Sequence, residues 1–206
     1  MDLLGQIEWW VGLLGGIAIS VTLGVIFDGI FRGIKRFRGT NAPQPLGILL
    51  KPFFYILAGA GFFILCWWIW LPLTATPPFW SRVVGLLTGV PLLFGGIGLI
   101  LWGRLTLGRQ YFVSTGRGAH LFTEHQLVTT GPYAIVRHPM YLGILLVGLG
   151  GTLFYRTWTM VFICLMYLGL RIRARREEEA LEEGFGEGWK EYQRSVPAWW
   201  PRIKKL

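Results

Sequence analysis

The stretch TTGPYAIVRHPMYLG in the second half of the chain combines groups that could bind a charged ligand. Arg137 and His138 stand directly before a proline and an apolar run. Proline is favoured as the first residue of a helix, because its missing N–H would have no partner there, so we expect His138 at the cap position. The free N–H groups and positive dipole end of such a helix attract anions. The stretch therefore predicts an anion site, although such residues at a helix mouth can equally anchor a span at lipid headgroups.

A second polar cluster, RARREEEALEEGFG, follows the last apolar region. Arg173 and Glu177 are four residues apart, so on a helix they are neighbours on one face. A solvated helix rich in charge pairs is the alternative interpretation. Both clusters directly adjoin the same apolar region, so they can converge on one membrane face. A helix N-terminus opposite a carboxylate and an arginine suits a zwitterionic ligand, such as an amino-acid-like cofactor.

The elements that must position these clusters are apolar helices. Of the 206 residues, 53% are hydrophobic and only 15% are charged. Three segments (9–31, 53–71 and 83–102) are close to the ~20 residues that cross a bilayer. A fourth, 140–170, is too long for one span and is interrupted by Gly148, Gly150, Gly151 and Arg156. The sequence predicts an all-α polytopic membrane protein with about five transmembrane helices, the last two forming a hairpin, followed by cytoplasmic C-terminal helices.

Lysine and arginine are unevenly distributed between the connections. They gather in the first and third connections and in the tail, whereas residues 72–78 carry no charge. By the positive-inside rule, the N-terminus is outside, and the polar clusters and the C-terminus are cytoplasmic. The net charge of +9 is then a topology and lipid-headgroup signal, and no nucleic acid partner is expected. Cys66 and Cys164 lie in apolar segments, and no disulfide framework or metal-ligand spacing is present.

The polar residues divide the chain into two parts. Residues 1–102 form a transmembrane scaffold of three helices, and residues 103–206 form a cofactor-binding and catalytic region. After the hairpin, helical character extends as far as Glu183. Gly184, Gly186 and Gly188 then separate this helix from a second short helix that ends at Pro197.

The motifs HQLVTTGPYAIVRHPMYLG and R…EE..L…FG…Y closely resemble the isoprenylcysteine carboxyl methyltransferase family. These integral-membrane enzymes use S-adenosylmethionine and are more distantly related to membrane phospholipid methyltransferases. The resemblance covers about residues 125–201 and implies that Arg173 handles the substrate. Glu177, the first of the EExxL pair, is implied to contact the cofactor, although three consecutive glutamates leave the register uncertain by one residue. The cofactor-binding residues implied by the resemblance are His125, Gln126, Leu127, Val128, Tyr133, His138, Pro139, Met140, Tyr141 and Glu177.

The resemblance implies methyl transfer to a lipophilic acceptor that enters from the bilayer, most like a prenylcysteine-type carboxylate. A carboxylate is already ionised and needs no general base, whereas an amine or thiol does, and Glu178 is the candidate base. A phospholipid amine, a small thiol and an isoprenoid remain open as acceptors. The alternative from another class is a non-catalytic or haem-binding membrane protein, with His125 and His138 as ligands, although their spacing matches no ligand motif.

Overall fold

The computed structural model describes residues 2–37, 52–111 and 126–201. Every regular element within these ranges is a helix, apart from an isolated bridge between Pro72 and Thr157, so the predicted all-α class is confirmed. The α-helices are α1 (Leu3–Phe37), α2 (Pro52–Trp68), α3 (Phe79–Val84), α4 (Val90–Leu107), α5 (Pro139–Tyr155), α6 (Trp158–Phe185) and α7 (Glu187–Ser195). A π-helical turn, η1 (Gly85–Gly89), joins α3 to α4, and two 3-10 turns are η2 (Gly108–Gln110) and η3 (Gly131–Ala134).

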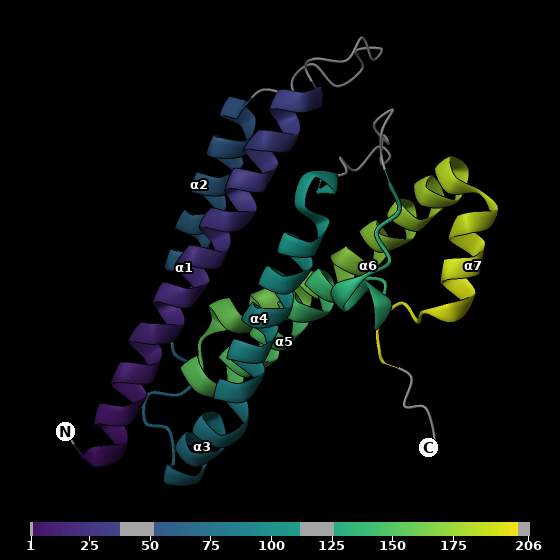
Figure 1. The fold of residues 1–206 in the computed structure, drawn as a ribbon. Coiled ribbons are helices and arrows are strands. Elements are labelled where there is room, and N and C mark those ends of the chain that lie inside the picture. The colour runs from purple at the N-terminus through teal and green to yellow at the C-terminus, as the bar shows by residue number, and fades with distance from the viewer. Residues whose placement is uncertain (1, 38–51, 112–125, 202–206) are drawn as a thin grey trace, which may run out of the picture.

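The centre of the molecule is the pair of helices α4 and α5, with α1 packed against α4 and α2 beside α1 on one flank (Figure 1). Helix α6 runs back along α5 and continues beyond it to α7, which folds back beside the end of α6 (Figure 1). The buried core of this arrangement joins α4 to α5 and is completed by side chains of α1. Its buried members are Leu93, Ile97, Ile100 and Val147.

Glycines allow α4 and α5 to approach each other closely. A Cβ atom at Gly96 would lie 2.6 Å from the carbonyl oxygen of Gly143, and one at Gly89 would lie 2.9 Å from that of Gly150. Small residues permit such backbone contact between membrane helices, where van der Waals packing contributes much of the association. Larger side chains at these positions would force the two central helices apart.

The same packing corrects one sequence interpretation. Gly148, Gly150 and Gly151 do not interrupt a helix: they lie inside α5 and are buried. The chain reverses instead at Arg156, whose φ of 53° is left-handed, and at Thr157, and α6 begins at the next residue. The end of α6 also differs slightly from the expectation, because the helix continues to Phe185 and breaks only at Gly186, where φ is 52°.

The outer surface of the helices is strongly apolar. Two helical stretches, Leu3–Arg32 and Phe79–Gln110, are long and apolar enough to cross a membrane, and Ile56–Trp68 and Pro139–Tyr155 are shorter apolar helices. Only 11% and 33% of the most apolar parts of the two long stretches are buried in the protein. Large side chains such as Trp67 and Trp80 are 82% and 75% exposed. Soluble monomers rarely expose apolar surface on this scale, so this surface is suited to lipid.

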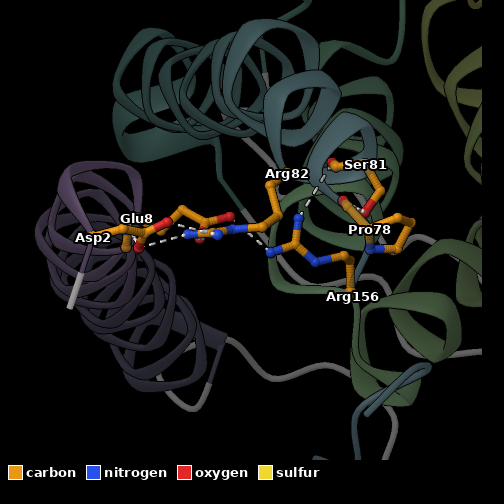
Figure 2. Close-up of polar contacts among 7 residues, drawn as sticks. Asp2, Glu8, Pro78, Ser81, Arg82 and Arg156 are labelled. Carbon is orange, nitrogen blue, oxygen red and sulfur yellow. Dashed lines mark hydrogen bonds and ion pairs between the residues drawn. The ribbon is translucent and has the colours of Figure 1, made fainter. Parts of the chain in front are cut away.

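Ion pairs fix the end of the bundle at which α1 begins (Figure 2). Glu8 accepts hydrogen bonds from Arg82 at 2.8 Å and from Arg156 at 2.9 Å. Arg82 also donates to Asp2, and Arg156 donates to the carbonyl oxygen of Ser81. These four charged residues (Asp2, Glu8, Arg82 and Arg156), which we call the N-terminal ion cluster, bind α1 to α3 and to the α5–α6 connection.

Candidate active site

The opposite end of α5 carries the predicted helix start. His138 is the N-cap residue and Pro139 occupies the first turn, as the sequence indicated. The backbone N–H groups of Arg137 and His138 donate to the carbonyl oxygens of Pro197 and Ala198, at 2.9 and 3.1 Å. The C-terminal segment therefore holds the chain in place immediately before α5. The N–H of Leu142 donates to His138, so the N–H groups before it in the first turn have no acceptor inside the helix and remain a source of positive potential.

Arg137 joins three helices at this end of the molecule. Its Nε and Nη2 atoms donate to the two carboxylate oxygens of Glu178 at 3.0 and 3.2 Å. Its Nη1 atom donates to the carbonyl oxygens of Gln193 and Val196 at 3.0 and 2.9 Å. The Nε2 atom of His138 lies 2.8 Å from the same Glu178 carboxylate. Arg137 thus links the start of α5 to α6 and to the end of α7.

The environment of Glu178 favours the ionised carboxylate. Burial opposes ionisation, but the hydrogen bond with His138 and the charge of Arg137 outweigh it, so the pKa of Glu178 lies below its ordinary value. The side chain is 19% exposed, and its carboxylate contacts both of these partners. A carboxylate in this state is a weak proton acceptor at neutral pH.

The neighbouring carboxylate, Glu177, has different partners. Its Oε1 atom accepts hydrogen bonds from the Tyr141 hydroxyl at 2.6 Å and from Arg173 Nε at 3.1 Å. Arg173 and Glu177 therefore lie on one face of α6, as their spacing predicted. Adjacent helix residues are about 100° apart, which is why Glu177 and Glu178 reach different partners. The two sequence clusters meet at the start of α5, through both glutamates.

Aromatic rings cover the start of α5. Trp199 stacks on His138 with ring centres 5.0 Å apart, and Tyr167 meets Trp199 edge-on. Tyr133 is buried, and its carbonyl oxygen accepts a hydrogen bond from Tyr192 at 2.7 Å. Burial raises the pKa of the Tyr133 phenol far above its usual range. The phenol therefore remains neutral and can act as a hydrogen-bond donor.

Sequence reasoning missed two residues that the structure places beside this site. Arg104 of α4 is 8% exposed, and its Cζ atom lies 4.4 Å from the ring centre of Tyr111. The charges of Arg104, Arg173 and Glu177 all act on the Tyr111 hydroxyl, whose pKa is raised chiefly by burial. In the sequence, Arg104 counts among the basic residues of the third connection, which indicate topology. It lies instead in the last turn of an otherwise uncharged apolar helix, and its burial distinguishes it from a surface arginine.

The structure also describes most of the remaining predicted cofactor residues. Pro139 is buried and Met140 is half-buried beside Gly103 of α4. Gln126 is exposed, Val128 is half-buried, and Leu127 packs against a buried cluster formed by α7 and the residues after it, namely Trp189, Tyr192 and Val196. His125 lies outside the described residues. Within the described residues, no three His, Cys, Asp or Glu side chains group as a metal site requires.

The helices and this end of α5 define a class: a helical membrane protein with a polar, aromatic-lined site at one end of its central helices. The family model for phospholipid methyltransferases matches residues 84–188, a little over half of the chain. The chain belongs to this family. The matched range includes Arg104, Tyr133, the whole of α5, and the Arg173–Glu178 segment.

Individual relatives point in the same direction. Protein-S-isoprenylcysteine O-methyltransferase of Schizosaccharomyces pombe is 34% identical over 82 residues, covering 39% of this chain and 35% of the relative. The human protein of that name is 28% identical over 150 residues, covering 66% and 49%. Methanethiol S-methyltransferase of Pseudomonas deceptionensis is 26% identical over 156 residues, covering 73% and 59%. The resemblance found in the sequence is confirmed, and the chain spans between about a third and three fifths of these relatives.

Proposed function

We propose that this chain is an integral-membrane methyltransferase that transfers a methyl group from S-adenosylmethionine to a lipophilic acceptor, most like a prenylcysteine-type carboxylate. The observation that carries the proposal is the meeting of Glu177 with the start of α5, inside the range that matches the family. The names of the isoprenylcysteine relatives support the class of acceptor.

The charges at the start of α5 suit the amino-acid part of the proposed cofactor. The carboxylate of Glu177 is assigned to the α-amino group, since a carboxylate can accept about four hydrogen bonds and can take an ammonium beside Tyr141 and Arg173. The first-turn N–H groups of Met140 and Tyr141 are assigned to the cofactor carboxylate. The remaining cofactor contacts proposed from the family resemblance are His125, Gln126, Leu127, Val128, Tyr133, His138 and Pro139.

The charge state of the site favours a carboxylate acceptor. The bound cofactor supplies a methyl group on a sulfonium, which a carboxylate oxygen can attack directly while the sulfur leaves as a neutral thioether. Arg173 is assigned to orient the acceptor, and the residues around α5 exclude water. No proton has to be removed, which agrees with a Glu178 that is ionised, hydrogen-bonded and a weak base. We therefore propose that Glu178 positions Arg137 and His138, and that it takes up the role of base only if the acceptor is an amine or a thiol.

The proposed membrane arrangement has five spans, with the N-terminus outside and the site and C-terminus cytoplasmic. The successive directions of α1, α2, α3–α4, α5 and α6 support this arrangement (Figure 1). Residues 1–102 are proposed as the scaffold and 103–206 as the catalytic region, although both contribute to one core, because Val147 of α5 packs with Leu93 of α4. Reporter fusions test the topology: a fusion in 72–78 that reports a cytoplasmic location would contradict it.

A small thiol is the second candidate acceptor. The relative named methanethiol S-methyltransferase covers 73% of this chain, more than either isoprenylcysteine relative described above. A thiol must lose its proton before it attacks, so this candidate requires a working base at the site. The two acceptors therefore differ in the chemistry that they demand of Glu178.

Methyl transfer from a labelled cofactor tests the proposal directly. Purified protein is incubated with an N-acylated S-prenylcysteine, a small thiol or phosphatidylethanolamine, and the labelled product is treated with alkali. A methyl ester releases its label as methanol, whereas methyl thioethers and methylamines keep it. We expect alkali-labile label with the prenylcysteine; label that is entirely alkali-stable would instead indicate a thiol or amine acceptor. No transfer together with a Soret band in the absorption spectrum would favour the haem protein.

Arg173 provides the second test of the proposal. In Arg173→Met we expect turnover with the prenylcysteine to fall by about 100-fold or more, because the acceptor is no longer oriented. Affinity for S-adenosylhomocysteine should change much less, since Glu177 retains Tyr141 as a partner. Arg175→Met, a substitution on an exposed face of the same helix, is the matched control. Equal losses in both variants would contradict the assignment.

A further inference from the structure

Exposed tryptophans are concentrated at the end of the bundle that carries the N-terminal ion cluster. All 11 tryptophans lie within the described ranges, and nine of them are exposed. Trp102 and Trp200 lie in other parts of the chain. The other seven, which we call the tryptophan belt, are 44% to 82% exposed: Trp9, Trp10, Trp67, Trp68, Trp70, Trp80 and Trp158.

Contacts between segments place the tryptophan belt at one level of the molecule. Glu8, which directly precedes the two belt residues of α1, pairs with Arg82, which follows that of α3 by two positions. The N–H of Trp158 donates to the carbonyl oxygen of Leu71 at 3.0 Å, and Trp70 packs edge-on against the last residue of α5. The start of α1, the end of α2, helix α3 and the start of α6 therefore share this end of the bundle (Figure 1).

The tryptophan belt marks a level and not one helix face. Trp9 and Trp10 are adjacent in α1, so their side chains point about 100° apart, yet they are 54% and 60% exposed. The adjacent pair at the end of α2 is likewise 82% and 75% exposed. A helix of a partner protein would cover a stripe along one face, whereas the belt draws on four helices over one short range of height. An indole has an apolar ring and one N–H donor, which suits the boundary between acyl chains and lipid head groups.

Helix α1 gives the distance from the tryptophan belt to the opposite boundary. After Glu8, this helix contains no charged residue before Asp28, which is exposed and pairs with Arg32 at 2.9 Å. Trp10 and Asp28 are 18 residues apart in one helix, or about 27 Å. The hydrocarbon core of a bilayer is ~30 Å thick. The belt and the first exposed charges beyond it are thus separated by about one hydrocarbon thickness.

We propose that the tryptophan belt binds the head-group boundary of the leaflet opposite the candidate site and fixes the depth of the protein in the bilayer. The indole N–H groups donate to lipid phosphate and carbonyl oxygens, and the rings lie among the upper acyl carbons. The lipid that fits is zwitterionic, because the charges of the N-terminal ion cluster compensate one another and residues 72–78 carry none. The belt is also continuous with the apolar surface of α1. This inference rests on the proposed membrane arrangement and holds whichever acceptor is methylated.

The test measures depth in the bilayer with a nitroxide attached to single cysteines. The full chain, with Cys66→Ala and Cys164→Ala, is reconstituted in dioleoylphosphatidylcholine vesicles. Separate variants carry the label at Trp67→Cys in the belt, at Asp28→Cys, and at Ile17→Cys on the exposed surface between these levels. Collisions are measured with oxygen, which enters the bilayer, and with a polar nickel chelate, which does not. We expect the ratio of oxygen to nickel collisions to be about 10-fold higher at Ile17→Cys than at the other two labels.

Tryptophan fluorescence of the unsubstituted chain provides a second measurement. Seven of the nine exposed tryptophans belong to the belt, so phosphatidylcholine brominated near its head group should quench more strongly than lipid brominated near the chain ends. Equal quenching by both lipids would overturn the proposal, as would a Trp67→Cys label as deep as that at Ile17→Cys. A Trp67→Cys label protected from both reagents would mean that a second copy of the chain covers the belt, and would also overturn it. A belt at the boundary in protein that transfers no methyl group would contradict only the proposed function, whereas a deep belt in active protein would contradict only this inference.

Discussion

The two ends of the helical bundle both contain clusters of arginines and carboxylates, but the clusters are built differently. In the N-terminal ion cluster, Glu8 accepts from two arginines, and Asp2 completes the pairing of Arg82 (Figure 2). Two carboxylates and two guanidiniums compensate one another. At the other end, three arginines (Arg104, Arg137 and Arg173) stand against two glutamates (Glu177 and Glu178). A cluster with equal numbers of positive and negative side chains can hold helices together. A cluster with surplus positive charge can attract an anion.

The three arginines at the site end differ in their hydrogen-bond partners. Arg137 directs its hydrogen bonds to a carboxylate and to two backbone carbonyls, which is the pattern of a structural link. Arg173 pairs with one glutamate and is 37% exposed, and Arg104 has a buried donor without a partner among the described residues. Charge alone therefore does not indicate function. The partners of each guanidinium separate Arg137, which links three helices, from Arg173, which we propose for binding of the acceptor.

The largest expected effect is on cofactor binding at Glu177. Glu177→Gln keeps the shape of the side chain but removes the charge that faces the proposed ammonium group, and we expect about a 1000-fold loss of affinity for S-adenosylhomocysteine. Calorimetry measures the affinity, and Glu179→Gln, on an exposed neighbour, is the control. If Glu178→Gln loses affinity while Glu177→Gln does not, the register must be shifted by one residue.

The second-largest effect is expected on the stability of the end of the bundle that carries the candidate site. Arg137→Met leaves Glu178 partly buried without its main cationic partner and removes the links to Gln193 and Val196. We expect a loss of about 3 kcal/mol in the free energy of unfolding. Thermal unfolding, followed by tryptophan fluorescence, measures this loss. Arg175→Met, on an exposed face of α6, is the control: if both variants lose similar stability, the contacts of Arg137 do not hold this end of the bundle together.

A smaller effect is expected from pH. The pKa of Glu178 is depressed in the folded protein, so its contribution to stability is complete above its ordinary pKa of about 4.3 and is lost as pH falls through the lower folded value. The melting temperature of the wild type should therefore fall on acidification from about pH 5 to pH 3. Glu178→Gln should melt lower at neutral pH but show a flatter profile. Parallel profiles would mean that Glu178 does not contribute to the acid sensitivity.

The helices and the candidate site were predicted from patterns that involve residues close together in the chain. The helix start at His138 and Pro139 follows from the chemistry of proline, and the Arg173–Glu177 pair follows from helix periodicity. The expectation that the two clusters converge followed from their positions beside the same apolar region, and the family resemblance supported it. Each of these inferences used residues close together in the chain or a motif of fixed order.

The features that were missed depend on contacts between distant segments. The glycines of α5 could break a helix or pack against a partner, and only the position of α4 shows that they pack. The packing of Arg104 depends on Gly29, which lies 75 residues earlier, and on Tyr111. The partner of Arg137 is a glutamate 41 residues away, which no local pattern indicates. Pairings at such distances are set by the packing of helices and cannot be read from spacing.

The smallest effect is expected at the N-terminal ion cluster and provides the control for the comparison. Arg156→Asn removes one of the two arginines that pair with Glu8, while asparagine still tolerates the left-handed conformation at this position. Because Arg82 remains paired with Glu8, we expect a loss of only about 1 kcal/mol in the free energy of unfolding. Affinity for S-adenosylhomocysteine and the KM for the prenylcysteine should be unchanged, since Arg156 follows the far end of α5, about 25 Å from its first residue. A loss of binding in Arg156→Asn without a loss of stability would mean that the two ends of the bundle are coupled. The distinction between a structural end and a ligand-binding end would then be wrong.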